Sequence, residues 1–480
     1  MKVLSILLVL LASAVAGLSQ TPQSTPPPPA KPRSVTFPKP AEQTLPNGLR
    51  VIVIQRSESP LVSAQLLIKN GGEADQDLSG LADMTADLLT KGTQTRDAKQ
   101  IADEIEGLGG SLDASARWDA SVATVGVMSS KIGPAMAILA DVVRRPTFKS
   151  DEVERLRQQS LDSITLALGD PGSIARFVAA RVVFGDSPYG HPIGGTPESL
   201  ARITPADITK FHAQYYRPDN AILVIGGDIT ATAGFALATR NFGDWPKPGT
   251  PLPASSGSAA ELARTARVVV IDKPDAGQAA VFLARPGISR KDPDYFRAMV
   301  TNSVLSGYSG RLNQEIRIKR GLSYGAGSVM DTRREVGPFW ASAQTKNESG
   351  AEVAGLLLGE VERLASAPPA EVELTPRKAV LIGNFSRNLE TAQGLVGQVA
   401  NLALYGLSLG EINRYIDGVS AITTSDIQKF AGSKLDAKTS SIIVVGNAKA
   451  FLPELEKRYG KVEVIPVAEL DLNSASLRKK

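Results

Sequence analysis

The sequence contains no cysteine in 480 residues. This absence excludes disulfides, thiolate metal sites, a cysteine nucleophile and a lipid-modified N-terminal cysteine. In an exported chain of this size, it favours a bacterial periplasm over a eukaryotic secretory route. Histidine is almost as scarce, because only His191 and His212 are present. A Ser/His/acid triad would therefore have to use one of these two imidazoles as its base.

Aromatic residues make up only 5% of the chain, and no run of Lys and Arg is interleaved with them. The formal net charge is +4 and the pI is about 9.0, which amounts to a weak field over such a length. The composition therefore gives no support to nucleic-acid binding. The last four residues, Leu477-Arg478-Lys479-Lys480, are expected to form a solvated tail.

Long apolar runs are absent except near the start of the chain. Residues 3–11 form an apolar run behind a single Lys, and Ala14-Val15-Ala16 are placed as a cleavage signal. We therefore predict a signal peptide over residues 1–16 and export, with a bacterial periplasm as the destination; an uncleaved anchor is the alternative. No membrane span is expected in the mature chain, because no other segment is long and apolar enough.

The length of the chain predicts two domains, since 480 residues exceed one ordinary core. The Pro-rich stretch over residues 17–40 is typical of an extended tether. A second Pro/Gly/Ser-rich stretch, residues 245–262, divides the remainder almost equally and indicates a linker. We predict one domain over residues 41–244 and another over 263–468, followed by a tail over 469–480.

Two segments of the chain resemble each other. ITPADITKFHAQYYRPDNAILVIGGD begins at Ile203, and ITTSDIQKFAGSKLDAKTSSIIVVGN begins at Ile422, an offset of 219 without a gap. Each has the pattern of a Thr-capped helix, a polar turn and an apolar strand ending in Gly. The repeat predicts two homologous domains. Because helical patterns alternate irregularly with short strands, we predict an α+β fold, each domain having a mixed, mostly antiparallel sheet with helices on one face.

Five stretches, in this order, resemble the pitrilysin/insulinase-type zinc peptidases, in particular the compact bacterial and mitochondrial-processing-peptidase-like members. They are LPNGLRVIVIQ, GLADMTADLLTKGT, YGHPIGGTPESL, YYRPDNAILVIGGD and SGYSGRLNQEIRIKRGLSYGAGS. The resemblance covers the chain from Pro46 to about Ile465. It implies that the two domains form half of a clamshell that closes around an unfolded peptide, which adds a strand to a sheet edge.

The metal-binding motif of that family is not intact in this chain. Active members bind zinc through His-x-x-Glu-His on a helix, with the Glu of the motif as general base. Here Asp83 and Asp87 stand at the two His positions, and Ala86 stands at the position of the base. Two readings of the acids remain open: they attract a hard cation such as calcium or magnesium, or they are solvated acids on a helix whose opposite face packs inward.

A more distant pair of acids accompanies the motif in active family members. The alignment puts Leu156 and Ser163 at these positions, and neither side chain binds or orients zinc. A shift of the frame brings Glu154 or Asp162 in instead, but no shift restores an imidazole. We therefore expect no cofactor in this chain.

The second half keeps a pair of residues that the resemblance connects with catalysis. Arg317 and Tyr324 are seven residues apart, and Gly321 lies between them where a helix should end. By resemblance, an Arg and a Tyr at this spacing reach the substrate beside the zinc. A guanidinium donates to a peptide carbonyl, and a phenol donates to the oxygen that becomes negative as water adds.

These features together predict the zinc-less subunit of a heterodimeric metallopeptidase. A homologous partner would hold the zinc, and this chain would supply Arg317, Tyr324 and half of a chamber for peptide substrates. The chain is not expected to be a peptidase on its own. A non-catalytic peptide- or protein-binding scaffold, possibly a homodimer, is the alternative. A third possibility is an independent hydrolase with a rebuilt site at Asp83 and Asp87.

Overall fold

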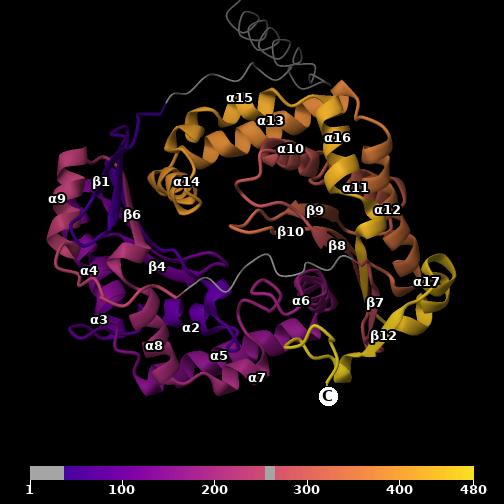
Figure 1. The fold of residues 1–480 in the computed structure, drawn as a ribbon, viewed down its shortest axis with the longest axis horizontal. Helices are drawn as coiled ribbons and strands as arrows, with labels where there is room; N and C mark the ends of the chain where they lie inside the picture. The colour runs from indigo at the N-terminus through magenta and orange to yellow at the C-terminus, as the bar shows by residue number, and fades with distance from the viewer. Residues whose placement is uncertain (1–36, 254–264, 480) are drawn as a thin grey trace, which may run out of the picture. The chain divides into compact units, whose positions relative to one another are not determined.

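Two six-stranded sheets organise the computed structural model, which describes residues 37–253 and 265–479 (Figure 1). In the first sheet the order is β1 (Ala41–Thr44), β2 (Arg50–Gln55), β6 (Ala221–Gly227), β3 (Leu61–Ile68), β5 (Ser121–Met128) and β4 (Ser111–Ala116). In the second it is β12 (Glu463–Pro466), β7 (Val268–Asp272), β11 (Ser441–Gly446), β8 (Ala279–Pro286), β10 (Pro338–Thr345) and β9 (Ala326–Met330). The predicted signal peptide, residues 17–36 of the predicted tether and residues 254–262 of the predicted linker lie outside the described residues.

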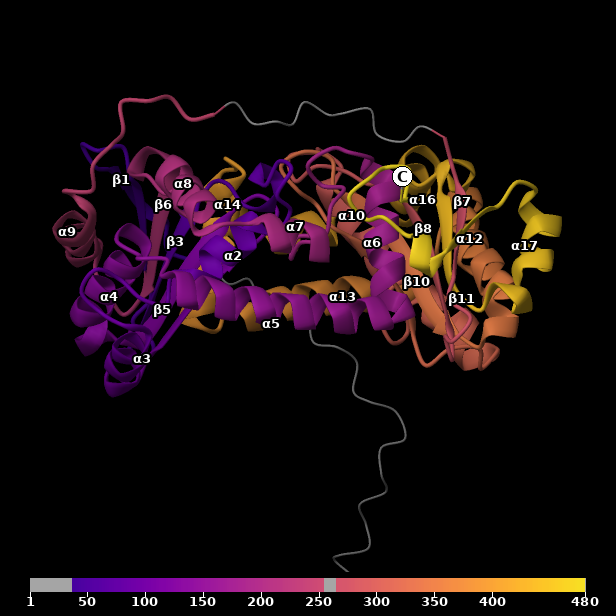
Figure 2. The same ribbon diagram turned by 90° about the horizontal axis from the view of Figure 1, so that it is seen from below.

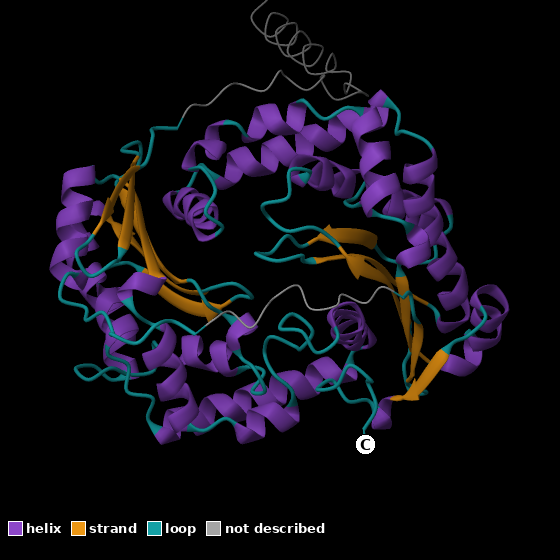
Figure 3. Ribbon diagram, viewed as in Figure 1, coloured by secondary structure: helices purple, strands orange, loops and turns teal. Residues whose placement is uncertain are grey.

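Both sheets are mixed and mostly antiparallel, as predicted. In the first sheet only β2 and β6 run parallel; in the second, β7 runs parallel to β11 and to β12. Helices flank the strands (Figure 3). In the first half they are α2 (Leu81–Leu88), α3 (Ala98–Gly107), α4 (Ile132–Arg144), α5 (Ser150–Gly169), α6 (Pro171–Phe184), α7 (Pro197–Arg202), α8 (Pro205–Tyr215) and α9 (Ala231–Phe242). In the second half they are α10 (Tyr295–Leu305), α11 (Arg311–Asn313), α12 (Gly350–Ser366), α13 (Glu371–Asn388), α14 (Ala392–Leu404), α15 (Tyr415–Ser420), α16 (Thr424–Lys434) and α17 (Leu452–Tyr459).

The internal repeat has the local structure that its pattern predicts. Thr204 caps α8 by accepting from the backbone N–H of Asp207, and Thr423 caps α16 by accepting from that of Asp426. In both helices the Asp carboxylate accepts from the backbone N–H of the capping Thr, which completes a capping box. The strands β6 and β11 follow these helices at equivalent places in the two sheets. The fold therefore contains two homologous halves.

Each sheet is covered on one face by helices of its own half and on the other by a helix from the other half. Helix α14 contacts β3 and β6 of the first sheet, and helix α6 contacts β8 and β11 of the second (Figures 1 and 2). Alternate residues of β6 accordingly enter different cores: Leu223 joins the core of the first half, whereas Val224 packs with α14. This explains why β6 and β11 are continuous apolar runs, buried along their whole length.

The tips of two equivalent hairpins also join the halves. Asp119, in the turn between β4 and β5, accepts from the backbone N–H of Arg334 at 2.8 Å and from the Tyr405 hydroxyl at 3.0 Å. The Tyr189 hydroxyl donates to the same carboxylate. Arg334 lies in the turn between β9 and β10, and its guanidinium donates to the Asp119 carbonyl oxygen at 2.8 Å. These hydrogen bonds around the buried Asp119 carboxylate join the two halves.

The C-terminal tail is only partly solvated: Arg478 and Lys479 are exposed, as expected, whereas the expectation was wrong for Leu477, which is buried. Leu472 and Leu477 are buried in the core around α6. The Arg181 guanidinium donates twice to the Leu472 carbonyl, at 3.1 and 2.7 Å, and the Ala475 N–H donates to Asp186 at 2.9 Å. The physical reason is that the tail covers the apolar side chains of α6, and its backbone carbonyl accepts hydrogen bonds from Arg181. No helix in the described part of the chain is long and apolar enough to cross a membrane.

Candidate functional site

Helix α2 holds the three positions of the degenerate motif. It begins after Gly80, which adopts a φ of 94°, and the buried Asp75 carboxylate accepts from the N–H groups of Gly80 and Ala82 at 2.8 and 2.7 Å. Ala86 is fully buried, so the position of the general base lies inside the core. Asp83 and Asp87 lie one turn apart on the half-buried side of the helix.

The electrostatics of the two acids differ from those of solvated carboxylates. Burial raises the pKa of Asp83 to about 7, and the neighbouring charge of Asp87 adds to the effect. Burial also raises the pKa of Asp87, although Lys91 opposes the shift. Asp83 and Asp87 are both half-buried, so they are less solvated than acids on a fully exposed helix face.

The side chains around α2 do not fit zinc. Helix α5 contacts α2, but Leu156 is buried in the core and Ser163 is exposed. The two acids that a shifted frame would recruit are engaged elsewhere: Glu154 accepts from Arg157 at 2.9 Å, and Asp162 accepts from Gln158 at 2.9 Å. Within residues 37–253 and 265–479, no group of three or more His, Cys, Asp or Glu side chains is placed to hold a metal ion.

Both histidines are held by backbone carbonyls. The ring nitrogens of His191 lie 3.0 Å from the carbonyl oxygens of Pro192 and Gly72, and burial lowers its pKa. Nε2 of His212 lies 2.8 Å from the Val143 carbonyl oxygen, and burial lowers its pKa to about 4. Both ring nitrogens of His191 and Nε2 of His212 are therefore occupied by structural contacts.

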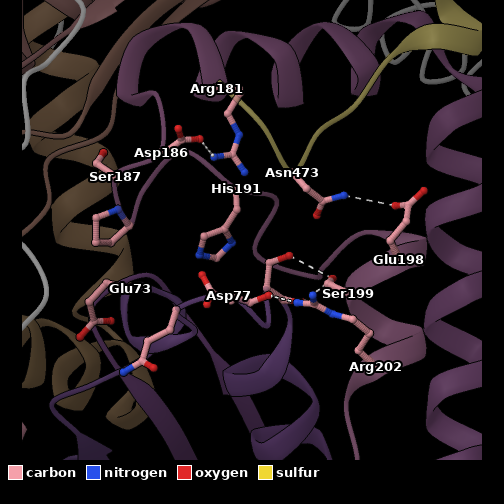
Figure 4. Close-up of a pocket in the computed structure, with 13 residues that line it drawn as sticks. Glu73, Asp77, Arg181, Asp186, Ser187, His191, Glu198, Ser199, Arg202 and Asn473 are labelled. Carbon is pink, nitrogen blue, oxygen red and sulfur yellow. Dashed lines mark hydrogen bonds and ion pairs between the residues drawn. The ribbon is translucent and has the colours of Figure 1, made fainter. Parts of the chain in front are cut away.

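A cavity of about 630 Å³ lies beside the start of α2 (Figure 4). It is lined by polar residues from the loop before α2, from α7 and from the C-terminal tail. Most of these groups bond to one another: Asn473 donates to Glu198 at 3.3 Å, and Ser199 donates to the Ser79 carbonyl at 2.7 Å. The cavity therefore marks where the tail is fastened to the first half, and we assign no ligand to it.

Arg317 and Tyr324 lie on either side of a sharp turn in the second half. Arg317 is in a π-helical segment, Gln314–Lys319, which continues α11. Gly321 has a φ of 66° and ends this segment, with its N–H donating to the Arg317 carbonyl. Tyr324 precedes β9 by two residues. The predicted end of the helix at Gly321 is confirmed, although the helix is π-helical there, and Tyr324 lies in the loop before β9.

The side chains of this pair are free to bind another molecule. The Arg317 guanidinium lies 5.5 Å from the ring centroid of Tyr308, and it makes no ion pair with any described residue. Glu315, the acid nearest in sequence, accepts instead from Lys319 at 2.9 Å and Arg320 at 3.1 Å. The Tyr324 side chain is 89% exposed.

Other exposed apolar side chains occur near this turn. Tyr308 is 73% exposed and Ile318 is 50% exposed, and Val329 on β9 is 44% exposed. Large apolar groups exposed together on a folded protein indicate a surface that another molecule covers. The sequence pattern did not predict this exposure, because strand and helix periodicity does not tell which face has a partner.

The fold and this site define a peptidase-like chain whose metal motif lacks its ligands. Two family models match it: "Insulinase (Peptidase family M16)" over residues 50–167, and "Peptidase M16 inactive domain" over residues 202–381. The chain belongs to the M16, or insulinase, peptidase family, as the sequence resemblance predicted.

Relatives and solved structures agree with this assignment. An uncharacterized zinc protease of Rickettsia bellii is 27% identical and covers 85% of this chain and 98% of its own. The M16 inactive domain from Pseudomonas fluorescens is 28% identical, with a TM-score of 0.80, and covers 85% of this chain and 98% of its own. The first half of the periplasmic protease PqqL from Escherichia coli has the same fold, with a TM-score of 0.67 and 18% identity, and covers 89% of this chain and 98% of its own. The whole PqqL chain is only 51% covered.

Proposed function

We propose that this chain is the zinc-less subunit of a heterodimeric M16 metallopeptidase. The partner is a homologous chain that carries His-x-x-Glu-His and the zinc. This chain contributes half of the peptide chamber and donates from Arg317 and Tyr324 to the substrate. The observation that carries the proposal is the contrast between the halves: the metal frame on α2 has no zinc ligands, while Tyr324 is exposed and Arg317 makes no ion pair with a described residue.

Two further observations support a partner. Tyr308, which contacts the Arg317 guanidinium, and Ile318, its neighbour in the chain, are exposed apolar side chains of the kind that a partner covers. This chain also matches about half of PqqL, a periplasmic protease in which one polypeptide holds both halves. Export to a periplasm is part of the proposal, and the apolar start of the sequence supports it.

Affinity isolation from the native cells, followed by mass spectrometry, is the experiment that tests this proposal first. A co-isolated chain of similar length that contains His-x-x-Glu-His, in near-equal amount, is the expected result. Isolation of this chain alone would favour the peptide-binding scaffold instead. A bound divalent ion that Asp87→Ala removes would favour the independent hydrolase.

In the reconstituted complex, Arg317→Ala and Tyr324→Phe should each lower the rate of peptide cleavage about a hundredfold. The reason is that each removes a donor to an oxygen that gains negative charge in the transition state. The melting temperature of this chain should stay unchanged, because neither side chain hydrogen-bonds to a described residue. Lys319→Ala, which removes a neighbouring surface ion pair, is the matched control. Full activity in both variants would contradict the proposed role.

A further inference from the structure

The face of the first sheet that α14 covers changes from apolar to polar towards β4. One row of paired residues crosses this face in the order Ile52, Val224, Gln65, Thr124 and Asp113. The first two belong to the apolar core under α14. The last three line a cavity of about 670 Å³. The polar end of the row therefore lies where the cover of α14 ends.

Gln65 is the unusual member of this row. Its neighbours Ala64 and Leu66 point into the core of the first half, whereas Gln65 points to the opposite face with Leu67. The side chain is only 7% exposed, and its carboxamide makes no hydrogen bond to any described residue. Neither amide atom of Gln65 is fully enclosed without a partner, so the carboxamide opens onto the cavity, where it can donate to and accept from a bound ligand.

Helix α14 presents more amides to the same cavity. Gln393, Gln398 and Asn401 line it, and their side chains make no hydrogen bond within the described part of the chain. Gly397 also lines the cavity, and a Cβ at this position would meet nothing within 4 Å. Amides thus border an open space from the sheet and from the helix.

The edge strand β4 opens onto this cavity. It pairs only with β5, so its other side has unpaired backbone N–H and C=O groups within the described structure. An extended chain that pairs with β4 would direct every second side chain onto the face of Gln65 and Thr124. The charged residues at the β4 side of the cavity, Asp113 and Arg117, have opposite signs and favour neither an acidic nor a basic peptide.

We propose that this cavity binds an extended peptide and selects uncharged polar side chains, namely Gln, Asn, Ser and Thr. Carboxamides both donate and accept hydrogen bonds, so Gln65 and the amides of α14 can pair with such side chains. An apolar side chain in the same place would leave these amides without hydrogen-bond partners, which disfavours its binding. The inference rests on the proposed function only in taking the occupant to be a peptide. It adds the chemical class of peptide that the chamber accepts.

Direct binding to the full mature chain, without a partner, tests the inference. The probes are three fluorescently labelled peptides of twelve residues, whose alternate positions are Gln and Asn, Leu, or Glu, and fluorescence anisotropy gives the affinities. The polar peptide should bind at least about tenfold more tightly than the others, the discrimination expected when about one net hydrogen bond is gained. Gln65→Leu should weaken its binding about tenfold.

Gly397→Leu provides a variant that does not endanger the fold. Leucine favours a helix more than glycine does, and the new side chain extends into open space. It should weaken binding of the polar peptide about tenfold by filling the cavity. Gly383→Leu on α13 is the matched control, because a Cβ there also meets nothing within 4 Å and Gly383 does not line the cavity. Equal affinity for the three peptides, or unchanged binding by Gly397→Leu, would overturn the inference.

The result separates this inference from the proposed function. A polar preference that Gly397→Leu abolishes supports the cavity even where cleavage in the complex proves independent of Arg317 and Tyr324. Loss of cleavage in those two variants with no peptide preference would overturn the inference alone. Failure of all three peptides to bind would overturn it as well.

Discussion

At the scale of single residues, helix α2 holds the positions of the metal motif, but most of its side chains are buried in the core of the first half. Ala86 is fully buried, and Asp83 and Asp87 keep carboxyl groups in a half-buried place that disfavours their charge. The motif positions were identified from the sequence frame alone. The raised pKa values were not predictable, since they depend on which elements cover this face of α2.

Asp83→Asn is expected to stabilise the protein at high pH. Because the folded-state pKa of Asp83 is about 7, above the ordinary value of 3.8, stability falls as the pH rises from about 4 through about 7. The amide removes this penalty, so the free energy of unfolding should rise on the order of 2 kcal/mol at pH 8 and little at pH 4. Urea denaturation at the two pH values measures the difference.

Asp162→Asn is the control for this prediction, because Asp162 is exposed on α5. It should change stability little at either pH. The same gain for Asp83→Asn at pH 4 and pH 8 would show that the carboxyl group is not held neutral by burial.

At the scale of elements, the sequence predicts the helices and strands of each half, but it does not predict which helix of one half packs on the sheet of the other. The capping boxes of α8 and α16 and the apolar strands that follow were readable, because caps and periodicity are local properties. That α14 covers the first sheet was not readable. An amphipathic helix shows that it has an apolar face, but not which sheet that face meets.

Leu395→Ala in α14 should lower the free energy of unfolding by about 2–5 kcal/mol. Leu395 is fully buried against the first sheet, so the truncation leaves a cavity in the core shared by the two halves. Leu166→Ala on α5 is the control, because Leu166 is 78% exposed and its truncation should cost less than about 0.5 kcal/mol. Denaturant unfolding compares the two, and similar small losses would show that α14 contributes little to the first half.

At the scale of the whole molecule, the exchange of helices makes the halves interdependent. Helix α6 of the first half packs on the second sheet, α14 of the second half packs on the first, and Asp119 joins the hairpin tips. The tail adds a fourth connection through Leu472. Each half therefore depends on the other to cover one face of its sheet.

Separate chains of residues 1–253 and 254–480, produced together, should assemble. Each fragment alone exposes an apolar sheet face and an apolar helix that its counterpart covers, so a tag on one fragment should retain the other at near-equal amount. Leu395→Asp in the second fragment is the control and should weaken retention, since it places a charge in the shared core. Two fragments that each purify folded and alone would contradict this interdependence.

The sequence by itself determined the family, the repeat, the α+β class with its mixed sheets, the loss of zinc ligands and the end of a helix at Gly321. These follow from residue identity and local pattern, which neighbours close in the chain decide. Only the tertiary structure decided the crossing of α6 and α14, the burial of the tail, the raised pKa of Asp83 and the cavity that Gln65 lines. Each of these depends on contacts between residues far apart in the chain, and a periodic pattern states that a face is apolar or polar without naming its partner.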